Sequence, residues 1–116
     1  MTTERFTVQD IREQSRYVLL DRGEDGGEPK EIGEEGYVDV GDDRVLYHTL
    51  VSDDYGGQGL ASKLVRQVVD DAIAAGKGIV AVCPYVVAWL SKHPEYAEHV
   101  VERRPEHTEA VRAATA

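Results

Sequence analysis

Two adjacent stripes of apolar side chains run through one segment of the chain at the spacing of an α-helix. One stripe has an apolar residue at every fourth position and the other follows one residue later: Leu60, Leu64, Val68 and Ala72, with Ala61, Val65, Val69 and Ile73. This spacing predicts a helix with one buried face that ends near Gly76. The continuous apolar run at residues 79–83 is typical of a buried strand, and Pro84 interrupts it.

A hairpin of two strands is predicted before this helix. Residues 36–40 and 44–51 are rich in β-forming side chains, and the residues between them, Gly41, Asp42 and Asp43, are typical of a short turn. The second strand has apolar residues on both faces, so we expect a central strand that is covered on both sides. Strand, helix and strand in this order predict a right-handed parallel crossover.

The first and last segments of the chain give no sustained pattern. We expect residues 1–14 to form an N-terminal extension and residues 105–116 to form a frayed C-terminal tail. Residues 24–33 are rich in glycine, proline and charge, which predicts a flexible turn. Residues 16–20 are rich in β-forming side chains and are expected to be a further strand.

Two further helices are expected after the apolar run. One lies between Pro84 and Pro94, and a shorter one covers residues 96–104. The sequence thus predicts an α/β (α+β) fold for a single domain at residues 15–104. Its sheet is expected to be mixed and mostly antiparallel, with a β-α-β crossover and flanking helices.

The formal net charge is −9 in 116 residues. This charge opposes binding to nucleic acid or to anionic membrane surfaces, and it weakly favours a cationic acceptor. No apolar run approaches the roughly 20 residues that cross a bilayer. The lone cysteine, Cys83, suits a reducing compartment, so we expect a cytoplasmic protein. No compact Cys-x-x-Cys or His-Glu-x-x-His spacing is present, so no metal site is expected.

Three glycines, Gly56, Gly57 and Gly59, lie between the long strand and the helix. Glycine allows positive φ and close approach of a ligand, and the first N–H groups of a helix have no partner within it. The segment can therefore hold a phosphate group, or it can be a tight turn without a ligand. Lys63 and Arg66 near the helix start oppose the helix dipole, which also suits a bound anion. P-loop and Gly-x-Gly-x-x-Gly patterns are absent.

Over about residues 16–101 the chain resembles a known family, the GCN5-related N-acetyltransferases, in their short YjdJ-type subgroup. The resemblance rests on four blocks: His48-Thr49-Leu50-Val51, Asp54-Tyr55-Gly56-Gly57-Gln58-Gly59-Leu60-Ala61, Cys83-Pro84-Tyr85 and His93-Pro94-Glu95-Tyr96. The last two blocks are specific to the subgroup. The resemblance implies a GNAT-like fold and acetyl-coenzyme A as the co-substrate.

The resemblance also implies which residues bind the coenzyme. The turn would hold the pyrophosphate and the strand end would pair with the pantetheine arm, through Gly56, Gly57, Gln58, Gly59, Leu60 and Ala61 and through Thr49, Leu50 and Val51. The family has Arg or Gln at the position of Gly56, so a side chain that ordinarily braces the loop is missing. Many members have a tyrosine acid at the position that Ser91 occupies here.

Acetyl transfer to an amine needs a proton acceptor, a donor to the thioester oxygen and an acid for the leaving thiolate. Cys83, at a strand end, could be a nucleophile or acid, or a small buried hydrophobe. His48 could be the base, or a core histidine with satisfied hydrogen bonds. Tyr85 could donate through its hydroxyl or pack in the core.

These observations predict an N-acetyltransferase that transfers an acetyl group from acetyl-coenzyme A to an amine. The acceptor could be a polyamine, a small metabolite or an amine of a protein or peptide. Two alternatives stay open. One is a non-catalytic module that binds or senses coenzyme A, and the other is an acidic protein-interaction domain in which the glycine turn is purely structural.

Overall fold

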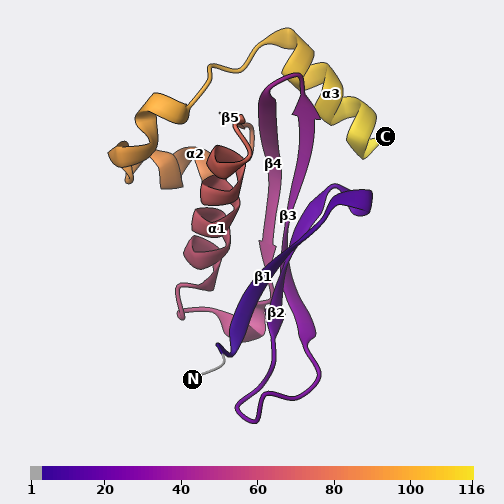
Figure 1. The fold of residues 1–116 in the computed structure, drawn as a ribbon, viewed down its shortest axis with the longest axis vertical. Coiled ribbons are helices and arrows are strands. Elements are labelled where there is room, and N and C mark those ends of the chain that lie inside the picture. Colours follow the sequence, from indigo (N-terminus) through magenta and orange to yellow (C-terminus); the bar gives the residue numbers. More distant parts are fainter. Residues whose placement is uncertain (1–3) are drawn as a thin grey trace.

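The computed structural model describes residues 4–116 and contains one five-stranded sheet (Figure 1). The strands lie in the sheet in sequence order: β1 (Phe6–Ile11), β2 (Arg16–Asp21), β3 (Lys30–Val40), β4 (Asp43–Val51) and β5 (Gly78–Ala81). The first four pair antiparallel, and β5 pairs parallel to β4. The predicted mixed sheet, its hairpin and its parallel crossover are therefore confirmed.

The predicted helix with apolar stripes is α1 (Leu60–Ala74), and it connects β4 to β5. Its stripes are buried against the sheet, where they form most of the core on that face. α2 (Pro84–Ser91) begins directly after β5 at a proline, which suits the first position of a helix. The remaining short elements are the 3-10 segments η1 (Arg12–Gln14), η2 (Asp53–Tyr55) and η3 (Pro94–His99).

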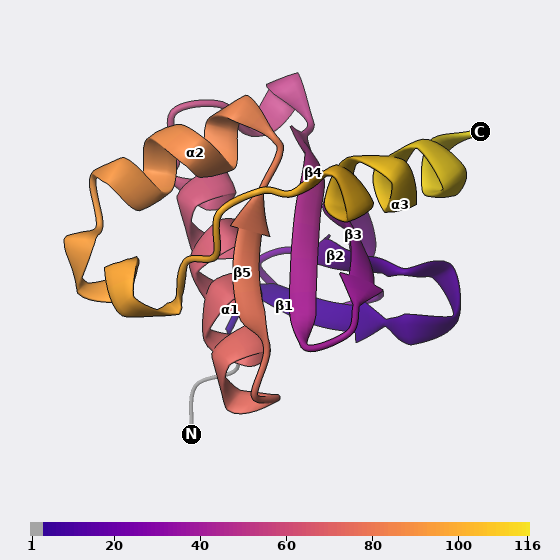
Figure 2. The same cartoon turned by 90° about the horizontal axis from the view of Figure 1, so that it is seen from above.

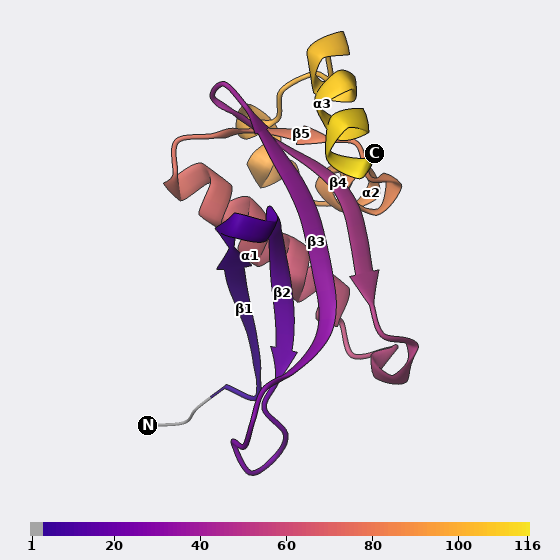
Figure 3. The same cartoon turned by 90° about the vertical axis from the view of Figure 1, so that its right-hand side faces the viewer.

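Both faces of the sheet are covered near the turn between β3 and β4. Leu46 and Ile79 belong to the core under α1, whereas Val45 and Val80 alternate to the other face and are also fully buried. α3 (Pro105–Thr115) lies on this second face, across β3 and β4 (Figures 2 and 3). The far half of β4 is not covered by α3, and there the second face is open.

β4 contains a bulge that changes which side chains face the core. Gly36 on β3 pairs with His48, but the next residue, Tyr37, pairs with Leu46, so Tyr47 is an extra residue on β4. Leu46 and Thr49 consequently face the same side, although a regular strand would place them on opposite sides. The prediction that this strand is covered on both sides along its length, with His48 buried, is therefore wrong beyond Leu46.

Other differences from the predictions occur in the terminal and loop segments. Residues 6–14 of the predicted extension form β1 and η1, and residues 1–3 lie outside the described residues. The predicted flexible turn at 24–33 ends early because β3 begins at Lys30. In place of a helix over residues 96–104, η3 is followed by an extended segment in which the Val101 N–H donates to the Ile79 carbonyl at 2.7 Å.

The predicted frayed tail is the helix α3, and a buried histidine holds it to the sheet. His107 is fully buried; its Nδ1 accepts the Arg104 N–H at 2.9 Å, and its Nε2 lies 3.0 Å from an Asp43 carboxylate oxygen. The helix was missed because its main buried contact is polar, so the sequence shows no apolar stripe there. No helix of the described chain is long and apolar enough to cross a membrane.

Replacing His107 with alanine should destabilise the protein by about 2–3 kcal/mol, because it removes a buried ring and leaves Asp43 with the exposed Arg104 as its remaining partner. Chemical denaturation measures this change. Arg112→Ala on the exposed side of the same helix is the control, with an expected change of about 0.5 kcal/mol or less. Equal stability of the His107→Ala and Arg112→Ala proteins would contradict the docking of α3.

Candidate functional site

β4 extends well beyond the end of β5, and this leaves an open strand edge. The last pair between the two strands is Leu46 with Ala81, and the Leu46 carbonyl accepts the N–H groups of Val82 and Cys83 at 2.9 and 3.1 Å. The chain then leaves the sheet at Pro84 to form α2. Within the described chain, residues 49–51 pair with β3 on one side and have no strand partner on the other.

The glycine turn lies at the end of this open edge. Gly57 and Gly59 have φ of +79° and +70°, which only glycine adopts readily, and Gly59 is the residue before the first turn of α1. In the part of the chain that the structure describes, no side chain caps the start of the helix, so its first N–H groups, from Leu60 onward, have no capping partner there. A cavity of about 210 Å³ lies against the turn and reaches from Val51 to Tyr85.

A second cavity lies beside the turn, and both positive side chains and the acidic Glu4 line it. This cavity, of about 320 Å³, is bordered by Arg5, Gln58 and Lys63. Arg66 does not contribute to it, because its guanidinium lies over the rings of Trp89 and Tyr96. Of the two early basic residues of α1, only Lys63 thus lies near the turn, and its Nζ is 3.5 Å from a Glu4 carboxylate oxygen.

Asp21 anchors the turn, which has a glycine at position 56, to the sheet. The Tyr55 hydroxyl donates to this carboxylate at 2.6 Å, and Arg5 Nε donates to it at 2.8 Å. These hydrogen bonds, first the one from Arg5, hold the pKa of Asp21 well below its usual range. Its role could not be found from the sequence, because its partners are brought together only by the fold.

Cys83 lies beside the open edge in contact with Thr49. Its sulfur is 3.3 Å from Thr49 Oγ1, and its residue is 8% exposed. The Thr49 hydroxyl in turn donates to the carboxylate of Glu35, the residue directly opposite on β3. Glu35 is fully buried, and burial raises its pKa to about 8. Sequence reasoning missed Glu35 because adjacent acidic residues such as Glu34 and Glu35 are typical of an exposed segment.

The two other predicted catalytic residues occupy different places. Tyr85 lines the cavity at the glycine turn, and partial burial raises the pKa of its hydroxyl, which stays a neutral donor. His48 is not buried: its side chain is 49% exposed, and its Nε2 lies 3.3 Å from a Glu34 carboxylate oxygen. The bulge turns His48 away from the face that carries Thr49, so the structure does not bring it to Cys83.

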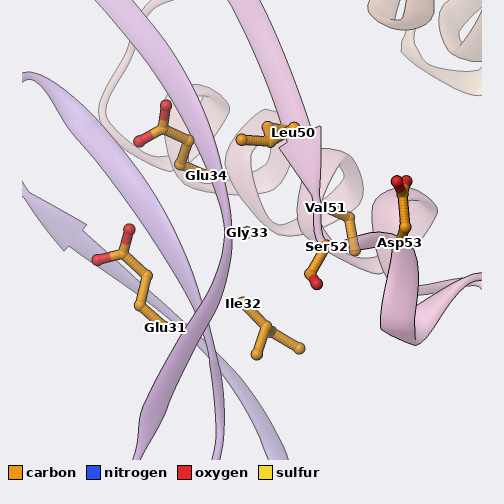
Figure 4. A pocket seen from close by; sticks show the side chains of 8 residues that line it. All are labelled: Glu31, Ile32, Gly33, Glu34, Leu50, Val51, Ser52 and Asp53. Carbon is orange, nitrogen blue, oxygen red and sulfur yellow. The ribbon is translucent and has the colours of Figure 1, made fainter.

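An acidic cavity of about 420 Å³ lies next to the glycine turn (Figure 4). Glu31 and Glu34 border it from β3, and Asp53 borders it from the segment after β4. Arg16 forms ion pairs with both glutamates, at 2.7 and 2.9 Å. The cavity shares Val51, Ser52 and Asp53 with the cavity at the turn, so the two are neighbours.

Comparisons with known proteins agree with this geometry. A family model described as GCN5-related N-acetyl-transferase matches residues 16–100. The fold is similar to that of a GCN5-like protein from Staphylococcus aureus, with a TM-score of 0.62, 24% identity and coverage of 90% of this chain and 97% of that one. No match was found among curated proteins.

A second similar structure is the ribosomal-protein-S18-alanine N-acetyltransferase from Escherichia coli. The TM-score is 0.54 and the identity 18%, over 79% of this chain and 54% of that enzyme, so this chain spans about half of the enzyme's length. At this identity the likeness concerns the fold alone. With the family model matching residues 16–100, this chain belongs to the GCN5-related N-acetyltransferase family.

Proposed function

We propose that this chain is an acetyl-coenzyme A-dependent N-acetyltransferase. The observation that supports this most is the open edge of β4, which leads from Cys83 to the uncapped start of α1. A strand edge offers N–H and C=O groups to an extended amide-bearing arm, and a helix start offers N–H groups to a phosphate. Acetyl-coenzyme A has both parts, and when bound it supplies an acetyl group activated as a thioester.

The chain offers each part of this ligand a complementary group. The backbone of residues 49–51 would hold the pantetheine arm, and the amides from Gly57 to Ala61 would hold the pyrophosphate. Lys63 and Arg5 lie beside the turn, where each is paired with an acidic residue, Glu4 and Asp21, in a chain of net charge −9. The attraction that we propose for an anionic ligand therefore comes mainly from the backbone N–H groups at the start of the helix.

Cys83 and Tyr85 are the residues that we propose for the chemistry. Cys83 lies at the inner end of the open edge, and Tyr85 lines the cavity at the glycine turn with a hydroxyl that can donate. Ser91, at the position of the usual tyrosine acid, is exposed and donates its hydroxyl to the Ala88 carbonyl at 2.7 Å. This bond occupies Ser91 within its own helix, so we assign it no part in the reaction.

The acidic cavity supports a cationic amine as the acceptor. Its carboxylates attract an ammonium group, and they outnumber the single positive charge of Arg16, which pairs with Glu31 and Glu34. His48 lies on the opposite face of β4 from Thr49, so we propose no direct part for it at Cys83. An open cavity of this kind suits a small polyamine or the amine of a protein side chain or terminus. We therefore propose an amine that carries at least one further positive charge.

Replacing Asp53 with asparagine should change the KM values of the two substrates in opposite directions. Asp53 borders both cavities, so loss of its charge should raise the KM for a diamine and lower the KM for acetyl-coenzyme A, each by about two- to fivefold. Steady-state kinetics measure both values. Glu28→Gln, in an exposed loop, is the control for removal of a carboxylate, and changes of equal size in that protein would contradict the assignment.

The proposed activity is tested by following release of free thiol from acetyl-coenzyme A with a panel of amines. We expect release that depends on both the amine and the protein, and that is fastest with cationic amines. Binding of acetyl-coenzyme A without release for any amine would favour the non-catalytic alternative. That alternative draws support from the serine at position 91 and from Gly56, where the family has a longer side chain.

A further inference from the structure

Glu35 is a fully buried carboxyl group that none of the roles above uses. Its Oε1 accepts the hydroxyl of Thr49, and its Oε2 has no hydrogen-bond partner within the described chain. A buried carboxyl oxygen without a partner is costly, and native proteins keep few of them. The position of Glu35 therefore calls for a reason beyond packing.

Among residues 4–116, no positive side chain pairs with Glu35. The nearby arginines are committed elsewhere: Arg44 binds Asp39, and Arg16 binds Glu31 and Glu34. The charged neighbour on its own strand is Glu34, which disfavours ionisation, while the Thr49 hydroxyl and the His48 backbone N–H favour it. Burial outweighs these bonds, so the pKa of Glu35 lies at about 8, and the group can take or give a proton near neutral pH.

Thr49 connects Glu35 to Cys83. Its hydroxyl oxygen contacts the carboxylate on one side and the Cys83 sulfur, at 3.3 Å, on the other. A hydroxyl can accept one hydrogen bond while it donates another, so the three groups form a continuous path for a proton. The bulge at Tyr47 produces this arrangement, because it turns Thr49 toward the face on which Glu35 lies.

We propose that Glu35 acts through Thr49 as the proton acceptor for the Cys83 thiol. The Cys83 S–H bond breaks as its proton passes to the Thr49 oxygen, and the original hydroxyl proton of Thr49 passes to the Glu35 carboxylate. The products are a Cys83 thiolate and a neutral Glu35, and the reverse transfer restores the thiol. Glu35 is thus a positioning residue, and its part in catalysis rests on the proposed function, in which Cys83 acts at the reacting centre.

Alkylation of Cys83 by iodoacetamide tests this path without any coenzyme or amine, since Cys83 is the only cysteine. The rate in the unaltered protein should rise with pH through about 8, as Glu35 ionises. Glu35→Gln should slow alkylation at that pH by about tenfold or more and move the rise to higher pH, as expected for loss of a general base. Thr49→Val should do the same, whereas Thr49→Ser, which keeps the hydroxyl, should stay within about threefold.

The controls separate this proposal from folding failure and from the proposed function. Unfolding would expose Cys83 and speed its alkylation, so slower reaction cannot come from a misfolded variant, and thermal melting identifies any variant that is not folded. The Glu28→Gln protein should keep the original pH dependence of Cys83 alkylation. If the Glu35→Gln protein does not fold, the alkylation rates of the Thr49→Val and Thr49→Ser proteins test the path instead.

An unchanged rate and pH profile in the folded Glu35→Gln protein, or equal rates for Thr49→Val and Thr49→Ser, would overturn the path. If alkylation behaves as expected but no amine is acetylated, the path stands and the proposed function fails. If acetyl transfer is normal but the alkylation profile is unchanged in the variants, the proposed function stands and the proton path fails. The two failures are therefore distinguishable.

Discussion

Replacing Ala61 with glutamate is expected to weaken binding of acetyl-coenzyme A by about a hundredfold or more while leaving the protein as stable as before. Ala61 is the second residue of α1 and borders the cavity at the glycine turn. A carboxylate there would lie close to the proposed pyrophosphate. Two like charges about 4 Å apart repel by about 4 kcal/mol at an effective dielectric constant of about 20, and each 1.4 kcal/mol is about tenfold in affinity.

The same substitution should favour the free protein. A negative charge in the first turn of a helix interacts well with the helix dipole and contributes about 0.3–1 kcal/mol. A lower affinity together with an unchanged or higher melting temperature would be specific to an anion site, because damage to the fold would lower both. Titration calorimetry and thermal melting measure the two quantities.

Gln67→Glu is the matched control, since it adds the same charge to an exposed position further along α1. It should change the affinity by about twofold or less, because exposed charges beyond a Debye length of about 10 Å are largely screened. If the proteins with glutamate at positions 61 and 67 bind equally well, the turn does not hold the pyrophosphate.

Replacing Cys83 with alanine is expected to lower the rate of acetyl transfer by about a hundredfold, which is typical for loss of a group that exchanges a proton in the reaction. Binding should stay within about threefold of the original, because the proposed contacts with the coenzyme are made by the backbone of residues 49–51 and by the turn. Cys83→Ser, which keeps the size but not the acidity of the thiol, should also be slow. Steady-state assays of thiol release measure the rates.

Ser91→Ala is the control for this experiment. Its hydroxyl is bound to the Ala88 carbonyl on the surface of α2, so its removal should leave the rate within about twofold. A large loss in the Ser91→Ala protein and none in the Cys83→Ala protein would reverse the assignment of the acid. Unchanged turnover in the Cys83→Ala protein alone would remove Cys83 from the mechanism.

The parts of the fold that carry a strong hydrophobic period could be predicted from the sequence. The stripes that begin at Leu60 and Leu64 specify α1, and the apolar run before Pro84 specifies β5, because each buries its apolar residues against the sheet. The glycine turn was placed correctly between β4 and α1 for the same reason. The family was predicted from the resemblance of four sequence blocks and is confirmed by the family model, while the YjdJ-type subgroup stays a prediction.

The elements that the sequence did not reveal depend on contacts between distant residues. β1 is a short edge strand in which only Phe6 and Val8 pack against the main core, and α3 is held by the polar side chain of His107. The bulge at Tyr47 is the most consequential case. It exposes His48 and brings Thr49 to Glu35, and no local pattern of apolar residues signals an inserted residue in a strand.

The central claim is that the open edge of β4 and the glycine turn together bind acetyl-coenzyme A. Its most direct test is a titration of the nitrogen-labelled protein with acetyl-coenzyme A, followed by the NMR shifts of individual backbone amides. We predict saturable shifts that are largest at residues 49–51 and 57–62, with no change at Gly41 in the distant hairpin turn. Absence of shifts at millimolar ligand, or shifts confined to α3 and the hairpin, would contradict the claim.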